Sequence, residues 1–172
     1  MKRYISYDQS PIGWLRTVGT EKNIVELKFS KTPGKSDRHL PKCIQTCKNQ
    51  LQEYFQGTRN KFHLPLSLTG TDFQKSVWRE LAAIPHGQAV SYGDIACRVG
   101  NPRSSRAVGG ANHVNPIVIV IPCHRVIGSN GHLAGFGGEL WRKEWLLRHE
   151  QAVFREGGIP IRYGYLPPKG AD

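Results

Sequence analysis

Hydrophobic and polar positions in the first 70 residues follow the pattern of a small α+β unit. Residues 12–29 predict a hairpin, because two short apolar runs flank a polar turn and the second run alternates as IVELKF. Residues 41–56 predict a helix, since a proline suits its first turn and Gly57 suits its end. Residues 62–68 read as a short edge strand that a proline interrupts.

The second part of the chain is patterned mainly as helices. A T-x-x-Q capping box opens a predicted helix at 71–81, and a second box, S-x-x-D, starts a short helix at Ser91. A tight turn at 100–102 leads to another helix, capped by Ser104 or Ser105. Two short helices joined by a glycine-containing turn resemble a helix-turn-helix, although many helical hairpins share this pattern.

The second helix of this pair combines small residues with arginines at its start. We expect Ala107, Val108 and Ala111 to face inward. Glycine inside a helix costs roughly 1 kcal/mol relative to alanine, so two adjacent glycines need a reason, and a close surface contact is one. The small residues are Ala107, Gly109, Gly110 and Ala111, and the arginines are Arg103 and Arg106.

The most informative stretch reads PIVIVIPCHRVIG. Five β-branched residues at 117–121 predict a buried strand, which Pro122 ends because it has no N–H for a ladder. Cys123 and His124 follow at the end of this element. From the residues alone, Cys123 is as readily a small buried hydrophobe as a reactive thiol, whereas for His124 a structural hydrogen bonder is favoured over a base.

The rest of the chain supplies a loop, a helix and a tail. Residues 128–138 are glycine-rich and predict a loop beside the cysteine, without the spacing of a phosphate-binding motif. Residues 139–149 predict a helix that buries two tryptophans and a leucine, and Glu150 then reads as a helix-end carboxylate. The tail, 151–172, is rich in glycine and proline and is expected to be extended or mobile. The residues expected to be buried are Trp141, Trp145 and Leu146 or Leu147.

Composition narrows the class of protein. The 172 residues carry a formal net charge of +11 and a sequence pI near 9.8, which favours a polyanionic partner such as nucleic acid over a merely basic surface. No run reaches membrane length and no signal peptide is apparent, so we expect a cytoplasmic protein with four free cysteines. Cys43 and Cys47 lie four apart on the predicted first helix, and we expect core packing there, not a metal.

Several motifs together resemble the O6-alkylguanine-DNA alkyltransferases, also called methylated-DNA–protein-cysteine methyltransferases. The resemblance is dense from about residue 71 to 150 and weaker before it. It implies an N-terminal ribonuclease-H-like α+β domain and a C-terminal, mostly helical, winged-helix-like domain with a helix-turn-helix. The motifs are PCHRVIG at 122–128, SYGDIA at 91–96, RAVGGAN at 106–112, Asn115-Pro116 and KEWLLRHE at 143–150.

The family resemblance implies a DNA repair protein that moves an alkyl group from guanine O6 onto its own Cys123, once per molecule. His124 would act as the base, through a water, and Glu150 would hold the imidazole in a Cys–His–Glu relay. Lys143 would help to protonate the departing guanine. Tyr92 resembles the tyrosine that turns the target phosphate and contacts the base.

The DNA contacts carry over in the same way. Arg106 resembles the finger that fills the gap left by a flipped base. Asn115 resembles the hinge residue between the helix-turn-helix and the active-site strand, and main-chain groups of Cys123 and Val126 would read the guanine edge. The other helix residues expected at the DNA are Arg103, Ala107 and Gly110.

This chain departs from the family pattern in two places. Phe136 and Gly137 stand where the family often has Tyr-Ser, so an aromatic wall and a backbone N–H remain but the hydroxyls are lost. Some members bind zinc through two cysteines and two histidines in the N-terminal domain. Here His63 is suitably placed, but no cysteine precedes Cys43, so we expect no metal and no cofactor.

The expected domains are 1–70, 71–150 and the tail 151–172, in a monomer that acts on double-stranded DNA and not on a membrane. Two other classes of function are open on the residues. A lesion-binding module without transfer is disfavoured by the cysteine. A Cys–His hydrolase or redox enzyme leaves the helix-turn-helix and the basic charge unexplained.

Overall fold

A computed structural model describes residues 1–154 and 160–165, and this part of the chain contains two compact units. The N-terminal unit consists of Met1–Thr69 together with Pro116–Val120. The C-terminal unit consists of Gly70–Asn115 and the chain from Ile121 onward. The domain ranges expected from the sequence stay a prediction, and the units differ from them in the return of residues 116–120 to the N-terminal unit.

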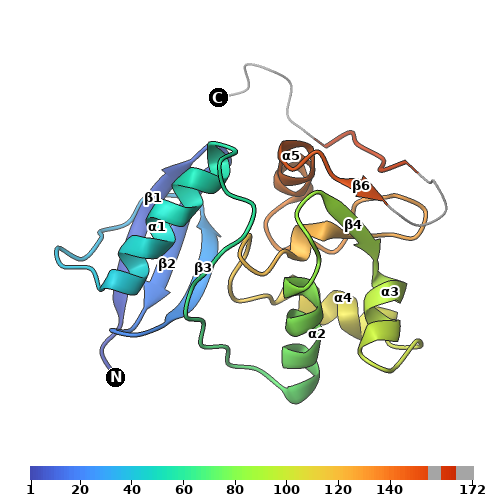
Figure 1. Cartoon of the computed structure of the whole chain (residues 1–172), viewed down its shortest axis with the longest axis horizontal. Coiled ribbons are helices and arrows are strands. Elements are labelled where there is room, and N and C mark those ends of the chain that lie inside the picture. Colours follow the sequence, from blue (N-terminus) through green and yellow to red (C-terminus); the bar gives the residue numbers. More distant parts are fainter. Residues whose placement is uncertain (155–159, 166–172) are drawn as a thin grey trace. The chain divides into compact units, whose positions relative to one another are not determined.

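The N-terminal unit is a three-stranded antiparallel sheet with one helix packed on a face (Figure 1). Strands β1 (Tyr4–Ser10), β2 (Gly13–Gly19) and β3 (Ile24–Ser30) form a meander, and helix α1 (Lys42–Phe55) crosses it. The predicted hairpin at 12–29 is therefore confirmed as β2 and β3, with β1 as an additional strand. Residues that alternate along a strand point to opposite faces, so one apolar face meets the helix.

Helix α1 buries Cys43 and Cys47 in the core, as expected, together with Leu51 and Tyr54. Both cysteines are core residues, and burial raises the pKa of the Cys47 thiol to about 12. The predicted edge strand at 62–68 is wrong. Only Leu66 pairs there, in one isolated bridge to Ile24, because the neighbouring Pro65 has no N–H with which to extend a ladder.

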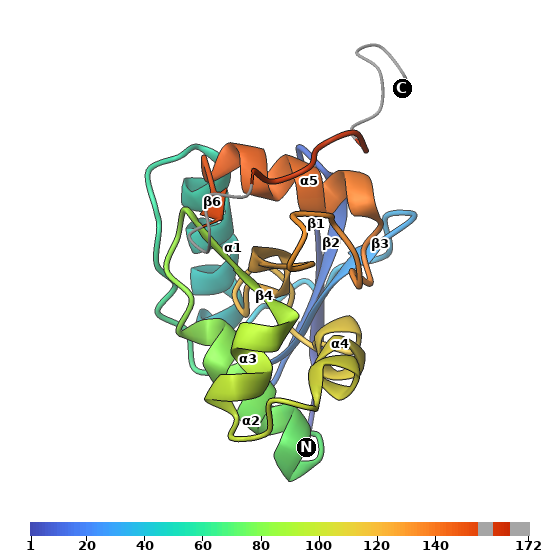
Figure 2. The same cartoon turned by 90° about the vertical axis from the view of Figure 1, so that its right-hand side faces the viewer.

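The C-terminal unit gathers three helices at one end and the last helix at the other (Figures 1 and 2). Helices α2 (Asp72–Ala82), α3 (Tyr92–Arg98) and α4 (Ser105–His113) pack together, while α5 (Leu140–His149) lies opposite. Both predicted capping boxes are present: the side chains of Thr71 and Ser91 accept the backbone N–H three residues on, and the side chain there accepts in return. Two of these helices thus begin where the sequence predicts.

A small parallel sheet joins the two ends of this unit. Strand β4 (Gln88–Ser91) lies between β5 (Val126–Ile127) and β6 (Val153–Phe154). Strands of two to four residues are too short to leave a clear periodic pattern in a sequence, so the sequence pattern does not predict them. They cover an apolar cluster of Ala89, Ile127, Leu133, Leu147 and Phe154.

The turn between α3 and α4 has the expected sharp geometry. Gly100 takes φ +82°, and the N–H groups of Gly100 and Asn101 donate to the carbonyls of Cys97 and Ala96, which is a Schellman ending. Ser104 occupies the N-cap of α4, but its hydroxyl donates to the Asn101 carbonyl (2.6 Å) and does not cap the helix.

One inward prediction for α4 is wrong. Val108 and Ala111 are buried, whereas Ala107 is exposed. Successive helical residues are rotated by about 100°, and the buried face of α4 runs through Val108, Ala111 and Asn112, so Ala107 lies outside it. Ala107 lies on the outer face of the helix-turn-helix.

The predicted strand at 117–121 is also wrong, although the run is buried as expected apart from the half-buried Val120. Ile117 forms a single bridge to Leu27, and Ile119 then takes φ +71°, which no strand residue adopts. The Val120 N–H donates to the Val118 carbonyl (2.8 Å), closing a γ-turn around Ile119. A β-branched residue in this conformation is strained by about 1–3 kcal/mol.

Helix α5 buries polar residues where tryptophans were expected. Lys143, Glu144, Leu146 and Leu147 are its buried residues, and the tryptophans at 141 and 145 are half-buried. Of the tail, residues 151–154 and 160–165 are described and are extended apart from a turn at the start, while 155–159 and 166–172 lie outside the described residues. Among the described residues, no helix has the length and apolar character needed to cross a membrane.

Candidate active site

Cys123 opens a short 3-10 helix, η1 (Cys123–Arg125), directly after two consecutive γ-turns. The second is an inverse γ-turn around Pro122 (φ −81°, ψ 66°), in which the Cys123 N–H donates to the Ile121 carbonyl (2.8 Å). The same carbonyl accepts from Asn115 Nδ2 (2.7 Å). Asn115, at the end of the helix-turn-helix, therefore holds the turn that delivers the cysteine.

The thiol of Cys123 is buried, with only 1% of the residue exposed. Burial raises the pKa of this thiol, while a hydrogen bond from Asn115 and the positive charge of Lys143 oppose that rise. The thiolate is the nucleophilic form of cysteine, so this thiol needs a base to react at neutral pH.

His124 is fully buried and supplies an imidazole of the required kind. Its Nε2 lies 2.7 Å from Glu150 Oε1, and burial lowers the pKa of the ring despite that carboxylate, so the imidazole rests neutral. An ionised carboxylate only accepts, so Nε2 carries the proton and Nδ1 the lone pair. Nδ1 is buried and has no protein partner among the described residues. The lone pair is available for a proton.

The Glu150 carboxylate is shared with a residue that the sequence analysis missed. Arg125 donates to it twice, from Nε (2.8 Å) and from a terminal nitrogen (3.0 Å), and donates its other terminal nitrogen to the Ile84 carbonyl (2.6 Å). Burial alone would raise the pKa of Glu150, but His124 and Arg125 outweigh it and hold that pKa far below its ordinary 4.5. Arg125 stands within the PCHR motif, and the near-complete burial of its charged side chain identifies it as part of the site.

Tyr92 and Lys143 meet the glycine-rich loop at one carbonyl. The Tyr92 hydroxyl and Lys143 Nζ both donate to the Ala134 carbonyl (2.5 Å each), and Nζ lies 3.3 Å from the Tyr92 oxygen. Burial lowers the pKa of Lys143 to about 7, although the nearby Cys123 favours its charged form. Burial raises the pKa of Tyr92, so its hydroxyl keeps its proton. Lys143 can hence exchange a proton near neutral pH.

The loop at 128–138 brings Phe136 and Gly137 to this site. Phe136 is buried, and Lys143 Nζ lies 5.9 Å from its ring centre. A Cβ on Gly137 would lie 2.8 Å from the His113 carbonyl oxygen, a distance that real side chains do not show. A serine, which the family often has at position 137, would therefore clash with the His113 backbone in this chain.

Asn112 is a second residue that the sequence analysis did not single out. Its Nδ2 donates to the Cys123 carbonyl (3.3 Å) and to the Gly135 carbonyl (3.1 Å), and so ties α4 to both η1 and the loop. It lies within RAVGGAN, but only the fold shows which carbonyls it reaches. Val126, another predicted site residue, is fully buried in β5 opposite Val90.

The predicted DNA contacts lie away from this cluster, on the outer side of the helix-turn-helix. Arg103, Arg106, Ala107 and Gly110 are all exposed. A Cβ on Gly110 would meet nothing within 4 Å, so no packing inside the described residues requires a glycine there. Contact with an external partner could therefore explain the glycine at this position.

Removing Arg125 should destabilise the protein strongly. Arg125→Met leaves the buried Glu150 charge with His124 alone and takes the guanidinium donor from the Ile84 carbonyl, a loss of about 3–5 kcal/mol in the free energy of unfolding. Urea unfolding measures it, with Arg98→Met on the exposed face of α3 as the control, expected within about 0.5 kcal/mol of the parent. Arg125→Lys, which keeps a charge, should fall between the two. An Arg125→Met midpoint equal to the control's would contradict this account.

Two family models match the chain. Residues 2–68 match the ribonuclease-like domain of 6-O-methylguanine DNA methyltransferase, and residues 72–152 match its DNA-binding domain. A methylated-DNA–protein-cysteine methyltransferase of Methanosarcina barkeri is 45% identical over 159 residues, which cover 88% of this chain and 99% of the relative. The relative from Mycobacterium bovis is 44% identical over 147 residues, covering 83% and 89%.

Solved structures agree with these matches. The crystal structure of Mycobacterium tuberculosis O6-methylguanine methyltransferase superposes with a TM-score of 0.79 at 40% identity, over 87% of this chain and 93% of that one. The M. tuberculosis protein in complex with DNA superposes with a TM-score of 0.77 at 42% identity, covering 84% and 91%. The fold expected from the sequence, a ribonuclease-like α+β domain followed by a mostly helical DNA-binding domain, is confirmed, and the chain belongs to the methylated-DNA–protein-cysteine methyltransferase family.

Proposed function

We propose that this protein repairs DNA by moving an alkyl group from O6 of a damaged guanine onto Cys123. The observation that carries the proposal is the buried pairing of His124 with Glu150 immediately after this cysteine, in the unit that also holds the helix-turn-helix. Transfer of an alkyl group to a protein cysteine is the activity for which the family is named.

The reaction is a single displacement. His124 Nδ1 takes the thiol proton, through a water, and the thiolate sulfur attacks the alkyl carbon. The new S–C bond forms as the O–C bond breaks, and the electron pair of that bond leaves with the guanine, which takes a proton from the Lys143 ammonium. Glu150 stabilises the imidazolium that results. The alkyl group stays on the sulfur, because passing it on from a neutral thioether would expel a thiolate, a poor leaving group, so each molecule reacts once.

The target base reaches Cys123 by leaving the duplex. Flipping costs a few kcal/mol of stacking and pairing. Arg106 fills the vacated space, while Arg103, Ala107 and Gly110 approach the groove from the same exposed side. In this proposal Tyr92 turns the target phosphate and contacts the base, and Asn115 is the hinge that links the DNA-binding helices to the reacting turn.

The pocket itself is built from main chain and one aromatic ring. Phe136 forms the wall, the Gly137 N–H meets the guanine oxygen, and main-chain groups of Cys123 and Val126 read the base edge. These contacts need no particular side chain at the reading positions. We further propose a monomer that acts on double-stranded DNA in the cytoplasm, where all four cysteines stay free thiols.

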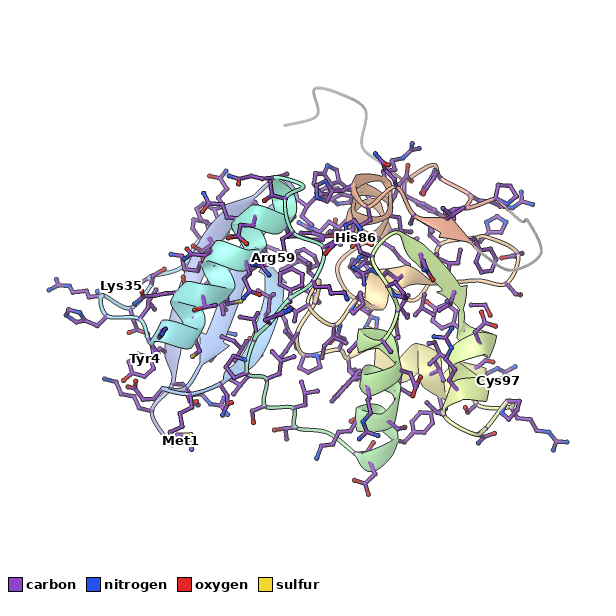
Figure 3. The ribbon with its side chains drawn as sticks, viewed as in Figure 1. Met1, Tyr4, Lys35, Arg59, His86 and Cys97 are labelled. Carbon is purple, nitrogen blue, oxygen red and sulfur yellow. The ribbon has the colours of Figure 1, made fainter. Side chains whose placement is uncertain are left out.

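Cys123→Ala should abolish transfer and leave DNA binding within about twofold of the parent, because only the reacting sulfur is removed. The parent, incubated with a duplex that carries O6-methylguanine, should gain one methyl group on the Cys123 peptide in the mass spectrum. Cys97→Ser is the matched control, since this thiol is exposed on α3 (Figure 3) and should be irrelevant to transfer. A parent that binds the duplex but stays unmodified would instead be a lesion-binding module.

Arg106→Ala should slow transfer from duplex DNA by about tenfold or more at saturating DNA, because flipping loses its replacement contact. Transfer from the free O6-methylguanine base, which needs no flipping, should be unchanged. Arg103→Ala should weaken binding, since a phosphate contact contributes affinity, without changing the rate at saturation. Identical effects of the two substitutions would rule out a finger role for Arg106.

The contribution of Lys143 should depend on pH. With a pKa of about 7, Lys143 is mostly in its ammonium form below that pH and loses this form as the pH rises above it. The ratio of parent to Lys143→Gln transfer rates should therefore be largest near pH 6 and approach one by pH 9. Lys143→Arg stays charged throughout and should show no such decline relative to Lys143→Gln. A ratio that does not vary with pH would exclude Lys143 as the proton donor.

A further inference from the structure

The described part of the tail contacts the turn at the far end of the pocket loop. The Arg162 N–H donates to the Gly131 carbonyl (2.8 Å), and Arg162 Nε donates to the Asn130 carbonyl (3.1 Å). Arg162 also forms an isolated parallel bridge with His132. We call residues 160–165 the strap. It adds a short edge to the loop at 128–138.

The strap is fastened to α5 by a buried carboxylate. Glu144 Oε2 accepts the backbone N–H groups of Gly164 (2.7 Å) and Tyr165 (2.5 Å), while Oε1 accepts Arg148 Nε (2.9 Å). Burial would raise the pKa of Glu144, but these donors lower it overall. A carboxylate that is 1% exposed and satisfied by two main-chain N–H groups fixes a backbone position.

Apolar contacts extend this attachment. Ile161 and Tyr163 pack on the cluster that contains Leu133 of the pocket loop, and the Arg148 guanidinium lies 4.2 Å from the Tyr163 ring centre. The strap thus holds the loop through Leu133 as well as through its main chain. The proposed mechanism assigns none of these residues a role.

The same loop, one residue further on, carries the site. Ala134 accepts from Tyr92 and Lys143, and Gly135 accepts from Asn112. Lys143 and Glu144 are neighbours on α5, so this helix holds the loop directly with one side chain and the strap with the next. The segment at 134–137 is therefore fixed at one side by the site and at the other by the strap.

We propose that the strap, fastened by Glu144, positions the pocket loop for alkyl transfer, so that Glu144 is a positioning residue for the reaction. The inference rests on the proposed function. Misplacing reacting groups by about 1 Å can cost about a hundredfold in rate, so partial loosening of the loop should be visible in transfer and not in DNA affinity. The helix-turn-helix, which binds the duplex, makes no contact with the strap among the interactions described above.

Glu144→Gln tests this in the full-length protein, with Glu80→Gln on α2 as the matched control. Amide hydrogen exchange at Gly164 and Tyr165 should accelerate about tenfold, since a charge-assisted acceptor is lost. Exchange at Gly128 and His132, whose N–H groups close the loop turn, should accelerate with them. The transfer rate at saturating duplex should fall about tenfold, with the DNA dissociation constant within about twofold.

Each outcome separates the two proposals. Faster exchange confined to Gly164 and Tyr165 would show that the strap does not hold the loop. A transfer rate equal to the parent's, measured while the loop exchanges faster, would show that the strap does not position the loop for transfer. A parent that transfers nothing would refute the proposed function, while the exchange measurements would still decide whether strap and loop open together. If Glu144→Gln does not fold, Arg162→Ala removes only the contact to Asn130, and should raise exchange at His132 without altering DNA affinity.

Discussion

A single buried carboxylate determines much of the C-terminal unit. Glu150 has no access to water, so its charge is tolerated only because His124 and Arg125 both hydrogen-bond to it. These are the two residues that follow Cys123. Fastening them to the end of α5 fixes η1, and Arg125 carries the attachment on to the carbonyl of Ile84 after α2. The position of the Cys123 sulfur therefore depends on a charge that lies on another element, at the end of α5.

Local chemistry explains what could be predicted of the fold. Capping at Thr71 and Ser91 is decided within four residues, so both helix starts were correct. The run at 117–121 was different. β-Branched residues report burial and a preference for extended backbone, but neither reveals a residue in the left-handed region, and Ile119 is held there by its surroundings. The error was one of backbone conformation, not of environment.

In the candidate site, too, local features could be predicted and features that depend on the fold could not. Cys123 and His124 are adjacent in the chain, and His124 contacts Glu150, as the family motifs imply; the relay itself stays a prediction. Arg125 and Asn112 were missed because their partners are carbonyls and a carboxylate brought close only by the fold. Lys143 was expected in the site, but its burial on α5, in place of a tryptophan, comes from packing that periodicity does not encode.

The brief return of residues 116–120 to the N-terminal unit has a consequence for any attempt to separate the two units. The chain leaves the C-terminal unit after Asn115, pairs Ile117 with Leu27, turns at Ile119 and comes back within five residues. A fragment that starts at Gly70 would carry this apolar run without the strand that pairs with it, immediately before Cys123. Such a segment is prone to aggregation when unpaired. The two units are joined by three crossings of the chain, so a cleavage at residues 69–70 cuts one connection and leaves two.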